Sequence, residues 1–170
     1  MPRTEIERII QPSLLDRLTD LEPGSAADPP ITRDESVRRF RQSVQRDVEV
    51  LLNTRRVLLR APESCPELHA SAYEYGLPDT TGIPIATNEG RERLMKSLQE
   101  TLERFEPRLA NPRVQLVESD QVRAPQVRFV VQATLRLDPH PELVVFDTTL
   151  ELASGEYAVR EGTMSDDDTQ

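Results

Sequence analysis

The stretch LMKSLQETLERFEPRL, residues 94–109, contains the transition that decides the fold. Its apolar side chains recur at helical spacing, at Leu94, Leu98, Leu102 and Phe105. This stripe predicts an amphipathic helix from about Glu89 to Phe105. Pro107 ends the helix, because the residue before a proline is pushed out of the α region. Glu106, Pro107 and Arg108 therefore form a rigid corner at the exit of the helix.

After the corner the hydrophobic period changes from 3.6 to 2. The clearest example is VRFVVQATLRL, Val127–Leu137, in which apolar and polar side chains alternate. Similar patterns predict three further strands, at Val114–Glu118, Leu143–Leu152 and Glu156–Arg160. Short loops join the last three strands, which favours antiparallel pairing.

Upstream of this region lies a second strongly helical segment. Thr32 and Glu35 form a capping box, and apolar residues then recur at spacings of three and four. A helix is predicted from about Arg33 to Asn53. Helices first and strands last indicate an α+β fold, with N-terminal helices followed by a small antiparallel sheet packed against them.

The chain divides into three parts. Residues 1–31 form an N-terminal arm and linker, in which Ser13 caps a short helix that carries the apolar stripe Leu14, Leu15 and Leu18. Residues 32–161 form a single α+β domain, with at most one short helix around Pro66–Tyr75 in its proline-rich middle. Residues 162–170 are acidic and polar, and a disordered tail is expected there.

The composition excludes several classes of protein. The 170 residues carry a formal net charge of −9, which disfavours binding to nucleic acid. The N-terminus lacks the apolar core of a signal peptide, and no segment approaches the roughly 18 to 20 apolar residues that span a bilayer. A single cysteine excludes an intrachain disulfide. A cytoplasmic protein without membrane insertion is expected.

No signature of catalysis is present. The chain has neither a Gly-rich phosphate loop nor a nucleophile in a recognisable setting. Cys65 and His69 share the spacing of one helix face, but zinc requires about three or four protein ligands and none of the other residues nearby supplies them. We therefore expect no catalytic residues, no metal site, no cofactor and no enzymatic activity.

The corner itself allows two interpretations. Glu106 can simply pair with a local arginine at an ordinary helix end, as surface ion pairs are common and weak. Alternatively, the rigid corner presents charges in a fixed arrangement, which suits a docking surface because little entropy is lost on binding.

Five motifs occur in the order found in the TssE proteins of type VI secretion baseplates, a family that includes a phage tail baseplate wedge protein. They are PSLLDRL (Pro12–Leu18), RDVEVLLNTRR (Arg46–Arg56), YGLPD (Tyr75–Asp79), ERFEPRL (Glu103–Leu109) and FDTTLELASGEY (Phe146–Tyr157). Together they extend over most of the chain, which resembles this family closely.

The resemblance implies a function. Glu106, Pro107 and Arg108 look like the Glu-Pro-Arg motif with which this family docks onto wedge subunits. Leu14, Leu15 and Leu18 can either cross to a neighbouring subunit or fold back onto the domain, and their separation from the domain by a linker favours the first. The implied partners are TssF and TssG, within a baseplate that also contains TssK and the spike protein VgrG.

The resemblance also implies a template for the contractile sheath. An exposed sheet edge can accept a strand from TssB or TssC by β-augmentation. The expected donors are the strands at Val127–Leu137 and Leu143–Leu152.

Two other functions fit parts of the sequence. The family has carried a lysozyme-like label, and a peptidoglycan hydrolase could use Glu106 with a second acid. An Arg-flanked corner, however, favours the ionised carboxylate, which is the wrong state for a general acid. A generic adaptor of another contractile injection system is the remaining alternative.

Overall fold

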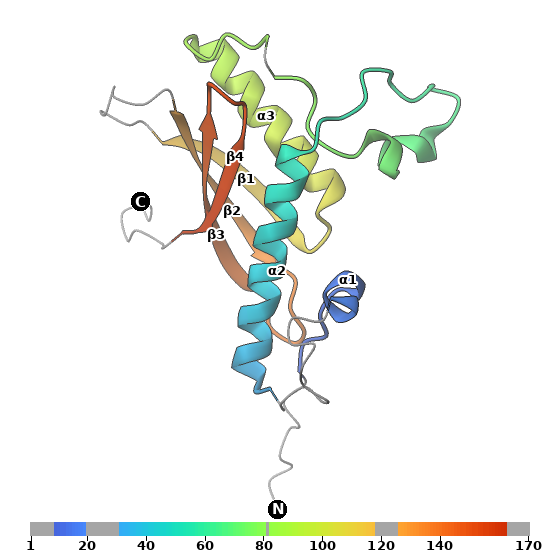
Figure 1. The fold of residues 1–170 in the computed structure, drawn as a ribbon, viewed down its shortest axis with the longest axis vertical. Coiled ribbons are helices and arrows are strands. Elements are labelled where there is room, and N and C mark those ends of the chain that lie inside the picture. Colours follow the sequence, from blue (N-terminus) through green and yellow to red (C-terminus); the bar gives the residue numbers. More distant parts are fainter. Residues whose placement is uncertain (1–8, 20–30, 81, 118–125, 163–170) are drawn as a thin grey trace, which may run out of the picture.

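The computed structural model describes residues 9–19, 31–80, 82–117 and 126–162. A long helix, a second helix and a four-stranded sheet form the body, and a short arm helix lies beside the long one (Figure 1). The elements are α1 (Leu14–Leu18), α2 (Arg33–Asn53), the 3₁₀ helices η1 (Pro66–Ala70) and η2 (Ala72–Glu74), α3 (Asn88–Phe105), β1 (Leu109–Val117), β2 (Gln126–Leu135), β3 (Glu142–Glu151) and β4 (Tyr157–Glu161). The predicted α+β class is confirmed.

Helix α2 begins and ends where the sequence predicts. The Thr32 side chain accepts the Glu35 backbone N–H at 3.3 Å, as expected for the capping box. The buried stripe consists of Val44, Val48, Leu51 and Leu52. Each such side chain stabilises the fold by about 1.5–3 kcal/mol relative to an exposed one. This stripe fixes which face of α2 points to the sheet.

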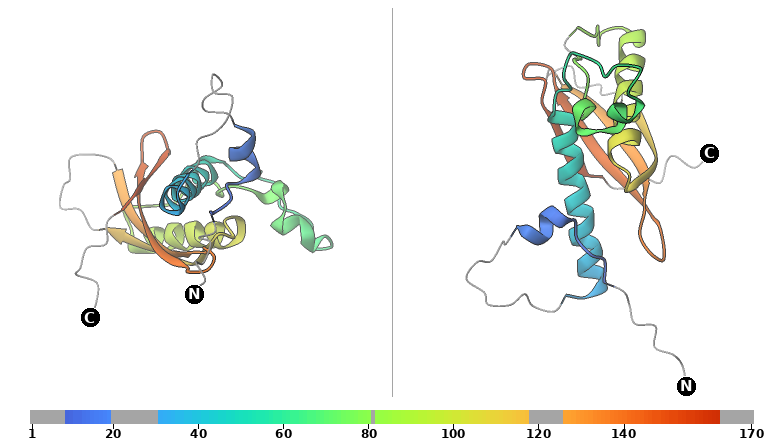
Figure 2. Two further views of the ribbon diagram at one scale, coloured as in Figure 1. Left: turned by 90° about the horizontal axis from the view of Figure 1, so that it is seen from below. Right: turned by 90° about the vertical axis from the view of Figure 1, so that its right-hand side faces the viewer.

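Helix α3 begins one residue earlier than predicted, at Asn88, because Thr87 is its N-cap and accepts the Gly90 N–H at 3.1 Å. Its stripe of Leu94, Leu98 and Leu102 is at most 1% exposed. Together α2 and α3 cover one face of the sheet, which curves around them (Figure 2). One layer of helices on one layer of sheet thus encloses a single core.

The sheet is an antiparallel meander with the order β1-β2-β3-β4. Val131 in β2 lies between Val114 of β1 and Phe146 of β3, so apolar side chains form rows across the helix-facing side. Since side chains alternate along each strand, the intervening polar residues lie on the uncovered face.

The strand order corrects one expectation. The strands at Val127–Leu137 and Leu143–Leu152, expected as donors for a sheath strand, correspond to the central strands β2 and β3. Strand β2 is paired on both sides, and β3 is paired with β2 along its length and with β4 from Phe146 to Leu150, so neither is an edge strand of the sheet. The sheet edges are β1 and β4.

Strand β1 is longer than predicted. It starts at Leu109, directly after the corner, rather than at Val114. Its register with β2 shifts between Ala110 and Arg113, where Asn111 has a φ of 51° and Pro112 lacks an N–H. This bulge breaks the alternation of apolar and polar residues. The sequence pattern therefore does not predict the first half of the strand.

The outer edge of β4 is capped by polar side chains of α2. Asn53 donates to the Tyr157 carbonyl at 2.7 Å and accepts the Tyr157 N–H at 2.9 Å. Glu49 accepts the Val159 N–H at 2.8 Å, and Gln45 donates to the Val159 carbonyl at 2.9 Å. These bonds occupy the backbone groups that an edge strand would otherwise offer to another chain.

The segment between α2 and α3 is irregular. The single short helix predicted at Pro66–Tyr75 is present as the two 3₁₀ helices η1 and η2. The segment is tied to the end of α2 at Gly76, whose φ of 107° lets the Leu77 N–H reach the Thr54 carbonyl at 2.7 Å. The expected disordered tail, from 163 onward, and residues 20–30 of the linker lie outside the described residues.

Candidate functional site

The corner after α3 converts a helix into a strand within three residues. The Glu106 N–H still bonds the Leu102 carbonyl at 3.0 Å, and the Leu109 N–H bonds the Glu106 carbonyl at 3.1 Å. Pro107, between them, prevents the helix from continuing and is exposed. The backbone therefore places Pro107 on the surface, with Glu106 and Arg108 on either side.

Glu106 and Arg108 form a two-pronged ion pair. Arg108 Nε lies 2.6 Å from Glu106 Oε1, and Arg108 Nη2 lies 2.6 Å from Glu106 Oε2. The same Nη2 bonds Asp47 Oδ2 on α2 at 2.8 Å, and the guanidinium lies over the Phe40 ring, 5.9 Å from its centre. Such paired geometry is the arrangement for which arginine is favoured over lysine.

The two charges differ in their exposure. Glu106 is 4% exposed, whereas the Arg108 side chain keeps 24% of its surface in solvent. Partial burial lowers the pKa of Arg108, but the carboxylates of Glu106 and Asp47 outweigh this effect and raise it. Arg108 is thus a permanent, oriented charge, and Glu106 serves to hold it.

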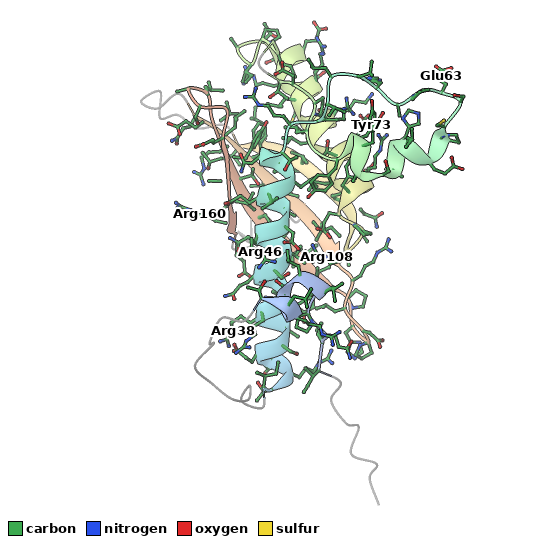
Figure 3. The ribbon with its side chains drawn as sticks, turned by 45° about the vertical axis from the view of Figure 1, so that its right-hand side comes forward. Arg38, Arg46, Glu63, Tyr73, Arg108 and Arg160 are labelled. Atoms are coloured by element: carbon green, nitrogen blue, oxygen red, sulfur yellow. The ribbon has the colours of Figure 1, made fainter. Side chains whose placement is uncertain are left out.

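The ion pairs continue from the corner to the arm. Asp47 Oδ1 lies 3.0 Å from Arg46 Nη2, and that same nitrogen lies 2.6 Å from Asp16 Oδ1 on α1. Arg46 and Arg108 accordingly lie beside α1 in Figure 3. Asp16 also accepts hydrogen bonds from Ser13 and Ser43, both at 2.6 Å. We call this chain of residues from Glu106 through Arg108, Asp47 and Arg46 to Asp16 the ionic relay.

The arm helix is held by polar contacts and leaves its apolar stripe outside. Leu14, Leu15 and Leu18 are 71%, 65% and 75% exposed, and no residue of α1 is buried. Before α1, the Ile10 N–H bonds the Ser36 hydroxyl at 3.2 Å. The structure thus brings the two predicted groups of site residues together through the relay, but it does not pack the leucines onto the domain.

Sequence reasoning did not find the middle of the relay. Arg46 and Asp47 lie within the motif RDVEVLLNTRR, but no local pattern shows that Asp47 faces a residue 61 positions later. The sequence does suggest a local arginine as the partner of Glu106, and in the structure this arginine is Arg108.

The arm should detach in acid. Partial burial raises the pKa of Asp16, but hydrogen bonds from Ser13, Ser43 and Arg46 outweigh it and lower the pKa from 3.8 to about 2. Because the folded pKa is depressed, the stabilisation is present above pH 3.8 and is lost as the pH falls toward about 2. After solvent screening we expect a loss of about 1 kcal/mol of arm docking.

This step is measurable from the amide NMR signals of Leu15 and Leu18 as the pH is lowered from neutral to about 2. The matched variant Asp16→Asn should lack the step. An identical acid transition in that variant would show that another group controls the arm.

No three His, Cys, Asp or Glu side chains among the described residues are grouped so as to hold a metal ion. Cys65 is exposed, and His69 bonds Glu74. No helix in the described part of the chain is both long and apolar enough to cross a bilayer.

Comparison with known proteins gives one family. The profile of the baseplate wedge protein gp25 family matches residues 38–140, which is more than half of the chain and includes most of α2, all of α3, the corner, β1 and β2. Comparisons with curated proteins and with solved structures gave no match. The expected resemblance to the family of TssE is confirmed. The chain belongs to the baseplate wedge protein gp25 family.

Proposed function

We propose that this protein is a non-enzymatic structural subunit of a type VI secretion baseplate, which docks onto the TssF–TssG wedge complex in the cytoplasm. The observation that carries the proposal is the ionic relay, which fixes the corner and the arm relative to each other. Membership of a baseplate family supports a role in assembly. TssK and VgrG are further members of the same assembly in this proposal.

The docking surface consists of Pro107, Arg108 and the leucines of α1. Pro107 is exposed, and the Arg108 side chain keeps 24% of its surface in solvent. Leu14, Leu15 and Leu18 are exposed on α1, which the ionic relay connects to the corner. Exposed apolar groups next to an oriented arginine are typical of the residues that dominate protein interfaces. Glu106 contributes by holding Arg108 and is not itself presented to the partner.

The same geometry supports a non-catalytic role for Glu106. Both carboxylate oxygens accept hydrogen bonds from Arg108 within 2.6 Å. A glycosidase acid must instead keep a proton and reach the leaving oxygen of its substrate. Glu106 is 4% exposed and is saturated by an arginine, so it is poorly placed for that task.

The test is a pull-down of the TssF–TssG complex with the wild-type protein and with Glu106→Ala/Arg108→Ala. Removing both charges leaves no unpaired carboxylate in the corner, so the fold should persist, as circular dichroism can verify. We expect retention of the partners to fall about tenfold or more, as for the loss of an interface hot spot. Leu14→Ser/Leu18→Ser should weaken binding as well.

A matched control is Glu35→Ala/Arg39→Ala, which removes an ion pair of the same two residue types from the exposed face of α2. This control should bind like the wild type. Normal binding by the folded corner variant would contradict docking at the corner and would direct the search to the arm or the sheet.

We further propose that β1 is the edge that accepts a sheath strand from TssB or TssC. The backbone of β4 is occupied by α2, whereas no hydrogen bond from outside the sheet caps β1 beyond Leu109 among the described residues. Along each strand, successive residues direct their peptide groups alternately to one side and the other. The hydrogen bond from the Arg136 N–H to the Arg108 carbonyl shows which residues of the neighbouring chain segment point toward β1. Val114 and Leu116 accordingly direct their peptide groups to the outer edge.

Cysteine crosslinking can test this edge. In a Cys65→Ser background, Gln115→Cys places a thiol on β1 and Ala158→Cys places a matched thiol on β4, both at exposed positions. A short bifunctional crosslinker should join the Gln115→Cys protein to the sheath subunit during assembly and leave the Ala158→Cys protein unlinked. Crosslinking from β4 alone would contradict the proposal.

A further inference from the structure

A second charged cluster lies away from the corner, between α3 and the irregular segment that follows α2. There a pocket of about 280 Å³ opens to the surface. The segment that forms one wall projects from the body, as the labelled residues Glu63 and Tyr73 show in Figure 3. The pocket is lined by Arg56, Arg60, His69, Glu74, Pro78, Ser97, Glu100, Thr101, Arg104 and Phe105.

Glu74 is the buried anchor of this pocket. It is 3% exposed, and its Oε1 accepts the Ala61 N–H at 3.1 Å and contacts His69 Nδ1 at 2.9 Å. Its Oε2 lies 3.2 Å from Arg104 and 3.9 Å from Arg56. The Ala61 N–H is the main cause that lowers the pKa of Glu74. Both oxygens are therefore engaged within the chain.

The pocket is lined by more arginines than carboxylates. Arg56, Arg60 and Arg104 face Glu74 and Glu100, and Glu100 is an exposed residue that also lies 3.9 Å from Lys96. No ion pair joins Arg60 to any carboxylate among the described residues. This local positive excess occurs in a chain whose net charge is −9. An added carboxylate would find donors in this pocket without displacing Glu74.

An apolar ridge continues from the pocket along the same segment. Val57, Leu58 and Leu59 stand between two of the lining arginines in sequence and are 51%, 90% and 76% exposed. Three consecutive exposed apolar side chains are unusual on the surface of a monomer unless they contact a partner.

We propose that this pocket binds an acidic segment of another protein, with a carboxylate between Arg60 and Arg104 and a neighbouring apolar side chain against Val57, Leu58 and Leu59. The planar fork of arginine matches a carboxylate, and the ridge supplies apolar contact that a nucleic-acid backbone would not use. This site is separate from the corner and does not depend on the function proposed there.

Fluorescence anisotropy with a labelled peptide of four Leu-Glu-Glu repeats tests the proposal. We expect a Kd of about 10–100 μM at low salt. The same peptide with glutamine in place of glutamate should bind at least about tenfold more weakly. Arg60→Gln/Arg104→Gln should weaken binding of the acidic peptide by a similar factor, with the fold verified by circular dichroism.

The matched control is Arg38→Gln/Arg39→Gln, which removes two positive charges from exposed positions on α2. It should leave peptide binding unchanged, as should Glu106→Ala/Arg108→Ala. No binding by the wild-type protein, equal binding of the glutamine peptide, or equal loss in the control would overturn the proposal. Displacement of the peptide by equimolar tripolyphosphate would also overturn it, because the pocket would then select phosphate.

Discussion

Arg108→Met is expected to lower the free energy of unfolding by about 3 kcal/mol, because it leaves the buried Glu106 carboxylate without its partner. The methionine keeps most of the apolar bulk over Phe40, so the lost charge, rather than a cavity, dominates the effect. Asp47 also loses its contact with Arg108 and, among the described residues, keeps its ion pair with Arg46. Equilibrium unfolding in urea measures the change.

Two further variants separate the buried ion pair from general surface effects. Arg39→Met removes an exposed arginine from α2, and it should cost less than about 0.5 kcal/mol. Glu106→Gln/Arg108→Met should recover about 1–2 kcal/mol relative to Arg108→Met, since the buried group is then neutral. A double variant less stable than Arg108→Met would show that the carboxylate is not the source of the instability.

Gly76→Ala is the second substitution with a large expected effect, a loss of about 3 kcal/mol or more. Gly76 has a φ of 107°, which side-chain-bearing residues rarely adopt. An added Cβ would also stand 2.4 Å from the Thr54 carbonyl oxygen, which is backbone and cannot rotate away. The substitution should break the bridge between Arg55 and Leu77 that ties the irregular segment to α2.

Gly82→Ala is the matched control, because nothing lies within 4 Å of the added Cβ and φ is not in the left-handed range. Its unfolding free energy should stay within about 0.5 kcal/mol of wild type. Thermal unfolding followed by circular dichroism compares the two. Equal stability of both variants would mean that the Gly76 turn does not require glycine.

The helices could be predicted closely because their signals are local. The capping box of Thr32 and Glu35 and the apolar stripes of both helices are readable within a few turns of sequence, whereas the Thr87 cap was seen only in the structure. The start of β1 could not be predicted in this way, since Asn111 and Pro112 interrupt the alternation at the bulge. Alternation also shows which face of a strand is buried but carries no information on which strand lies at an edge.

The candidate site could be predicted only in part. The corner follows from Pro107, and the arm helix from its Ser13 cap, because each depends on neighbours in sequence. The relay between them depends on Asp47 meeting Arg108, a contact that only the packing of α2 against the corner creates.

The capped edge of β4 has a consequence for self-association. Head-to-tail addition of identical copies through opposite sheet edges would produce an open-ended filament. Here Gln45, Glu49 and Asn53 occupy the Tyr157 and Val159 backbone groups that such growth would need. A second copy therefore cannot pair with β4 at Tyr157 and Val159, whereas pairing of β1 with β1 would give a closed dimer. The capped edge thereby opposes open-ended growth through the sheet while β1 keeps an edge that can pair.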